Sequence, residues 1–88
     1  MKMRPKIKPV HPGRILRDEF MAPAGMSQYR LAQATGLSLA QVGSIARGKR
    51  GITVETAQRL ERTLGVSAQT WVNLQALYDH EKTLASPG

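Results

Sequence analysis

The sequence of 88 residues contains no cysteine, only six acidic residues and no long apolar run. Without cysteine, disulfide bonds and cysteine-ligated zinc sites are excluded. The two histidines, His11 and His80, stand far apart and have no second histidine or acidic residue at ligand spacing, so neither a metal site nor a cofactor is predicted. A domain of this length buries a smaller share of its surface than a larger domain does, and we therefore expect self-association to support it.

No apolar stretch approaches the roughly 20 residues that a transmembrane helix requires. The basic N-terminus also lacks the apolar core and the small-residue cleavage site of a secretory signal. We therefore expect no membrane insertion and a cytoplasmic location. Thirteen Lys and Arg residues against six Asp and Glu residues give a formal net charge of +7. This excess predicts a polyanionic partner, with nucleic acid as the first candidate and an anionic membrane surface as the second.

The chain divides into a basic arm, a helical domain and a short tail. Residues 1–11 carry four basic residues, two prolines and no acid, which favours an extended arm. Residues 12–84 contain a succession of helix start and stop signals with apolar residues at helical spacing. Pro12 suits a first helical turn, and residues 22–25 are expected to end that helix. Residues 85–88 are expected to fray.

Four further helices are predicted after the first, and no segment alternates as a strand would. Their N-caps are Ser27, Ser38, Thr53 and Ser67. In the helix after Thr53, residues 54, 57, 60 and 64 are apolar and fall at helical spacing. The predicted fold is all-α, a compact five-helix domain of the lambda-repressor-like helix-turn-helix type.

The two helices on either side of Gly36 form the helix-turn-helix. Glycine suits the turn because glycine is the residue that adopts a positive φ without a steric cost. Ser38 and Gln41 have the spacing of a capping box at the start of the second of these helices. Val42 and Ile45 are three residues apart on that helix, and we expect both to point into the core.

Anchoring Val42 and Ile45 places the small side chains of Ala40 and Ser44 on the outward side, with Arg47 at the end and Gly43 beside them. Small side chains allow a helix to enter the major groove deeply, and Gly43 would let the backbone approach DNA. The same small residues would also suit close packing of helices within a protein. The predicted DNA-binding residues are Gln28, Ser38, Ala40, Gln41, Ser44, Arg47, Lys49 and Arg50.

Four stretches over about residues 11–79 resemble the HigA-type antitoxins, a VapI-like group of helix-turn-helix regulators. The stretches are "HPGRILRDEF", "SQYRLAQATGLS", "GKRGITVETAQRL" and "WVNLQALYD". The resemblance implies a homodimer that binds DNA, represses its own operon and neutralises a RelE-like, mRNA-cleaving toxin of the HigB type. Arg14 stands where the family usually has glutamate, and Gly43, Ser44 and Ala46 replace residues that are usually larger or polar.

The last predicted helix carries an apolar stripe that begins at Trp71. Most of it is expected to pack in the core, and the remainder is expected to contact a second copy. The predicted dimer contacts are Leu77, Tyr78 and Leu84. A two-fold dimer would place two recognition helices about 34 Å apart and would require a near-palindromic operator.

Two alternatives to an autorepressing antitoxin remain open on the sequence. One is a free-standing or phage-type repressor without a toxin partner, and the other is a protein-binding module that inhibits an enzyme. The chain itself is not expected to be an enzyme. Asp18 and Glu19 project in different directions from one helix, and no set of nucleophile, base and orienting group can be assembled.

Overall fold

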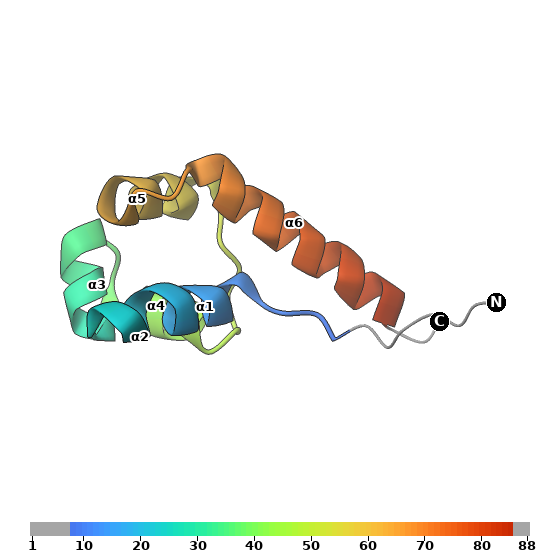
Figure 1. Ribbon diagram of the computed structural model, residues 1–88, viewed down its shortest axis with the longest axis horizontal. Helices are drawn as coiled ribbons and strands as arrows, with labels where there is room; N and C mark the ends of the chain where they lie inside the picture. The colour runs from blue at the N-terminus through green and yellow to red at the C-terminus, as the bar shows by residue number, and fades with distance from the viewer. Residues whose placement is uncertain (1–7, 86–88) are drawn as a thin grey trace.

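The computed structural model describes residues 8–85, and within them every regular element is helical (Figure 1). The first three elements follow one another without interruption and form one helical segment, so the described chain has five such segments. The all-α, five-helix prediction is confirmed. The elements are α1 (Pro12–Ile15), the π-helix η1 (Leu16–Met21), α2 (Ala22–Ala24), α3 (Gln28–Thr35), α4 (Leu39–Ala46), α5 (Val54–Leu64) and α6 (Ala68–Ala85).

The first segment begins at His11 and ends at Gly25. The ring nitrogen Nδ1 of His11 accepts a hydrogen bond of 2.8 Å from the Gly13 N–H, and Pro12 fills the first turn as predicted. Residues 22–25 end the segment as predicted, with Ala22–Ala24 as its last helical residues. The chain leaves the helix at Gly25, whose φ is +63°.

The helix starts that the sequence predicts are present at α3, α4 and α5. Ser27 accepts from the Arg30 N–H at 3.1 Å, and Thr53 accepts from the Thr56 N–H at 3.2 Å. Between α3 and α4, Gly36 adopts a φ of +81°, which only glycine takes up without strain. These hydrogen bonds satisfy backbone donors that a helix leaves unpaired at its start, so each helix begins at a defined residue.

The core lies between the first segment, α3, α4, α5 and the start of α6. Val42 and Ile45 are 1% and 2% exposed, so the predicted anchoring of α4 is confirmed. Its buried neighbours include Leu16, Leu31, Ile52, Ala57, Leu60 and Trp71. Val54 lies outside this core although it belongs to the apolar spacing of α5, because its side chain is 59% exposed. As the first residue of α5, Val54 projects to solvent, and Ile52 of the preceding loop occupies the core instead.

Helix α6 starts in the core and then extends away from the other helices (Figure 1). Trp71 in its first turns is fully buried, and its ring centroid lies 5.4 Å from that of Phe20. Its Nε1 has no hydrogen-bond partner in the part of the chain that the structure describes. The predicted tail begins one residue too early, because Ala85 still belongs to α6 and residues 86–88 lie outside the described residues. Residues 1–7 of the predicted arm also lie outside them.

None of the helices within residues 8–85 combines the length and the apolar character needed to cross a membrane. No group of three or more histidine, aspartate and glutamate side chains within the same range could hold a metal ion.

Candidate DNA interface

The outward side of α4 is open to solvent over most of its length. Ala40 and Arg47 are exposed and Ser44 is half-buried, so no helix within residues 8–85 covers this side. The opposite side of α4 holds Val42 and Ile45 in the core. The structure therefore leaves a narrow helical surface with small side chains available to a partner.

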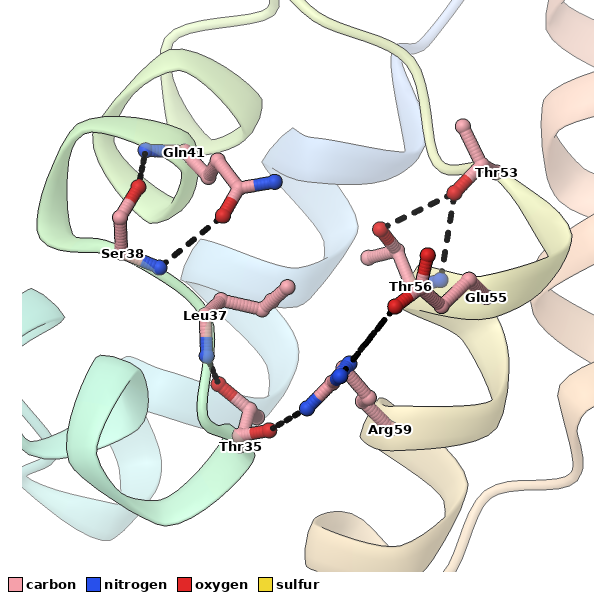
Figure 2. A network of polar contacts seen from close by, with 8 residues as sticks. All are labelled: Thr35, Leu37, Ser38, Gln41, Thr53, Glu55, Thr56 and Arg59. Atoms are coloured by element: carbon pink, nitrogen blue, oxygen red, sulfur yellow. Dashed lines mark hydrogen bonds and ion pairs between the residues drawn. The ribbon is translucent and has the colours of Figure 1, made fainter.

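A capping box fixes the start of α4 (Figure 2). The hydroxyl oxygen of Ser38 accepts from the Gln41 N–H at 3.0 Å, and Gln41 Oε1 accepts from the Ser38 N–H at 3.0 Å. Both residues were predicted to contact DNA. Their two acceptor oxygens already serve the helix, whereas Figure 2 shows the side-chain nitrogen of Gln41 pointing away from these bonds.

Gly43 is buried, contrary to the expectation that its backbone lies open to DNA. The side chains of Arg47 and Gln28 cover it. A Cβ atom built at Gly43 would lie 3.0 Å from Arg47 Nη1 and 3.2 Å from Gln28 Oε1. Glycine at this position thus makes room for two predicted DNA-binding side chains, one from α3 and one from the end of α4, which meet over the α4 backbone.

The basic turn after α4 is tied back to the helix that precedes it. The backbone N–H groups of Lys49 and Arg50 both donate to the carbonyl oxygen of Ser44, at 2.8 and 3.2 Å. Gly48 allows this reversal with a φ of +76°. Lys49 and Arg50 are exposed, and neither they nor Arg47 form an ion pair with residues in the described range. The turn presents three positive charges beside the open side of α4.

The loop that follows the basic turn is held by α6. Gln75 Oε1 accepts a hydrogen bond of 2.8 Å from the Ile52 N–H, and its amide group lies against Gly51. This bond links the helix predicted to mediate dimerisation with the segment that carries Lys49 and Arg50. Capping and spacing signals do not indicate this bond, because Gln75 lies 23 residues from its partner.

A bridge from α5 holds the turn between α3 and α4 (Figure 2). Arg59 donates to the carbonyl oxygen of Thr35 at 2.9 Å and pairs with Glu55 at 3.2 Å. Thr35 is at the end of α3, where a positive charge is favoured by the helix dipole. Gly36 also leaves space for the guanidinium, because a Cβ there would lie 2.8 Å from Arg59 Nη1. The Glu55–Arg59 spacing in the sequence indicates the ion pair but not the contact with Thr35.

The first helical segment packs directly on the end of α4. A Cβ atom at Gly13 would lie 1.7 Å from the carbonyl oxygen of Ile45, a distance that no side chain can occupy. Arg17 of the same segment donates to the carbonyl oxygen of Ala46 at 3.5 Å. These contacts fix the end of α4, and with it the position from which Arg47 projects.

A cleft of about 370 Å³ lies between the first segment, the end of α4 and α6. Arg14, Arg17 and Arg47 are among its lining residues. Two of these arginines are paired with Asp18, at 3.5 Å from Arg14 and 2.8 Å from Arg17. The hydrogen bond from Arg17 and the nearby positive charges keep the pKa of Asp18 below its usual value. Arg14 therefore has a partner on its own helical segment.

His11 and Tyr78 form one wall of this cleft. Their ring centroids lie 4.9 Å apart in an edge-to-face arrangement, which joins the start of the first segment to α6. Burial lowers the pKa of His11, and Lys82 adds to this effect, whereas Asp79 and the main chain of Arg50 oppose it. Tyr78 is half-buried by these contacts, while Leu77 and Leu84, the other two predicted dimer contacts, are 52% and 45% exposed.

The sequence profile of the helix-turn-helix family matches residues 16–71, which include α3, the turn and α4. Antitoxin HigA-1 of Vibrio cholerae serotype O1 is 32% identical over 74 residues, which cover 84% of this chain and 70% of that protein. This chain belongs to the HigA-type antitoxin family. The family resemblance inferred from the sequence is confirmed. Because these proteins are DNA-binding regulators, the prediction that the chain is not an enzyme is confirmed with it.

A second relative and a solved structure agree with this assignment. Virulence-associated protein I of Dichelobacter nodosus is 47% identical over 70 residues, which cover 80% of this chain and 65% of that protein. The chain thus spans just under two thirds of that relative's length. The Pseudomonas aeruginosa antitoxin HigA with the higBA promoter superposes with a TM-score of 0.85 at 44% identity, covering 89% of this chain and 85% of that one.

Proposed function

We propose that this chain is an antitoxin that binds a near-palindromic operator as a homodimer and represses its own operon. The exposed side of α4 carries the proposal, because Ala40 and Arg47 face solvent while Val42 and Ile45 are buried. A helix with such a surface fits the major groove of B-DNA. The similarity to a HigA protein with promoter DNA supports the same conclusion.

Each predicted contact residue has a role that suits its position. Arg47 projects from the end of α4 and is suited to a base edge or a phosphate. Lys49 and Arg50, in the exposed turn, are suited to phosphates. Ser44 and the side-chain nitrogen of Gln41 can form hydrogen bonds with base edges. Ala40 lets the helix approach closely, and Gln28 and Ser38 lie at the starts of α3 and α4, where phosphates are favoured.

The exposed end of α6 is the proposed dimer contact. Leu77 and Leu84 are seven residues apart, which places them on the same side of this helix, and both are about half exposed. Tyr78 lies at the edge of this surface and also packs on His11. A second copy related by a two-fold axis would cover the leucines and present two α4 helices to successive major grooves, about 34 Å apart.

The DNA-binding part of the proposal is tested by selecting duplexes from a random pool with the full chain. We expect a selected near-palindromic sequence, and Arg47→Ala should weaken its binding by about 1–3 kcal/mol. Replacing Lys49 and Arg50 together should weaken binding to all DNA and reduce the salt dependence by about one unit of slope per lost phosphate contact. Arg62→Ala, in α5, is the control for loss of a positive charge. It should change neither the affinity for DNA nor the salt dependence of binding.

A chain that enriches no sequence above bulk DNA would contradict the proposed function. If the Arg47→Ala variant binds the selected sequence as tightly as the unchanged protein does, Arg47 is not part of the interface. An unaltered salt slope in the double variant would show that Lys49 and Arg50 do not contact phosphates.

The proposal includes neutralisation of a RelE-like, mRNA-cleaving toxin of the HigB type. Membership of the antitoxin family supports this part of the proposal. Co-expression with the product of the neighbouring gene should yield a stable complex in which mRNA cleavage is blocked. If operator binding is retained but no neighbouring gene product binds or is inhibited, the chain is a free-standing repressor.

A further inference from the structure

The first turn of α4 offers fewer polar groups to a partner than its sequence suggests. The hydroxyl oxygen of Ser38 and Oε1 of Gln41 each accept a backbone hydrogen bond of 3.0 Å within the capping box. Figure 2 shows both bonds closing on the start of the helix. The two residues between them, Leu39 and Ala40, are apolar and exposed.

Leu39 is a large apolar side chain with no place in the core. Its exposed fraction is 52%, whereas Val42, three residues later, is 1% exposed. Leu39 precedes Gly43 by four residues, so it lies on the same flank of α4 as the position where Arg47 and Gln28 meet. An exposed leucine at this point is an apolar contact surface directly beside two polar predicted contacts.

The only methyl group on the major-groove edge of the standard base pairs is the C5-methyl of thymine. We infer that the start of α4 recognises thymine through this methyl group, with Leu39 as the main contact and Ala40 beside it. The inference rests on the proposed function, since it specifies which feature of the operator α4 reads. The positive charges at the other end of α4, on Arg47, and in the turn that follows, on Lys49 and Arg50, favour DNA over an apolar protein surface, because they are unpaired within the described residues.

Uracil provides the direct test, because it pairs as thymine does and lacks only the methyl group. The duplex selected by the full chain is synthesised with uracil in place of thymine at one position of each half-site at a time. We expect affinity to fall about fourfold for each methyl group that Leu39 or Ala40 covers. Substitution outside the contacted positions should leave affinity unchanged.

Leu39→Ala is the decisive variant. It should bind the thymine duplex less tightly and should lose most of the difference between thymine and uracil at the contacted position. Val54→Ala removes an apolar side chain of similar exposure from α5 and should keep that difference intact. A helical circular dichroism spectrum equal to that of the unchanged protein confirms that each variant is folded.

The possible failures are distinct. Selection of no specific duplex would reject the proposed function itself. Specific binding with equal affinity for thymine and uracil at every position would overturn this inference and leave the proposed function standing. A Leu39→Ala variant that retains the full thymine preference would also overturn it, as would one that binds DNA normally but no longer binds the toxin.

Discussion

Replacing Gly43 with alanine should affect the stability of the protein and its affinity for the operator in opposite directions. Alanine is favoured over glycine inside a helix by about 1 kcal/mol, and Gly43 has ordinary helical geometry. The new methyl group would lie 3.0 Å from Arg47 Nη1 and 3.2 Å from Gln28 Oε1. Both atoms are at the ends of flexible side chains that can move aside. We therefore expect the free energy of unfolding to rise by up to about 1 kcal/mol.

Operator affinity should change in the opposite direction. Because the methyl group displaces Arg47 from its place over Gly43, we expect Gly43→Ala to weaken operator binding by about 1 kcal/mol, the lower end of the range for a lost contact. Urea denaturation measures the stability, and fluorescence anisotropy with the selected duplex measures the affinity. A variant that is more stable and yet binds less tightly would be difficult to explain by a purely structural role for Gly43.

The double variant with Arg47→Ala decides whether Gly43 acts through Arg47. If it does, adding Gly43→Ala to Arg47→Ala should cause little further loss of affinity, because the displaced side chain is already absent. If the losses of operator affinity from Gly43→Ala and Arg47→Ala add in full in the double variant, the reasoning is refuted. A fall in stability on Gly43→Ala alone would refute the premise that Arg47 and Gln28 can move aside.

Three further predictions concern stability, each measured by urea denaturation. Gly13→Ala should destabilise the fold by about 3 kcal/mol or more, because its Cβ would overlap the Ile45 carbonyl oxygen; a loss below about 1 kcal/mol would contradict the close packing. Arg59→Ala should cost about 1.5–3 kcal/mol through the lost bond to Thr35, whereas a loss within the surface range of about 0.5 kcal/mol would show that the bridge contributes little. Stability should also fall as the pH drops below 6.5, since the lowered pKa of His11 makes the unfolded chain the stronger proton acceptor. His11→Asn, which retains an N-cap side chain, should remove that component of the pH dependence, and an unchanged profile would refute it.

The elements and their starts could be predicted from the sequence because short-range interactions determine them. The capping box joins Ser38 to Gln41, three residues apart, and the inward side of α4 follows from the helical spacing of Val42 and Ile45.

The contacts that position the candidate interface could not be predicted in the same way. Gln28 meets Gly43 from another helix, Arg59 reaches Thr35 across 24 residues, and Gly13 packs on Ile45. Each depends on the distance and angle between two helices, which neither periodicity nor capping signals specify. The sequence therefore indicated which residues lie on the outward side of α4 but not that Arg47 lies across Gly43.

The chain contains one tryptophan, and Trp71 is fully enclosed beside Phe20. Because its indole joins α6 to the first helical segment and has no contact with the exposed side of α4, its emission should report separation of these two elements while remaining insensitive to a duplex bound at α4. The protein thus carries a built-in fluorophore, and unfolding can be followed in the presence of DNA without any attached label.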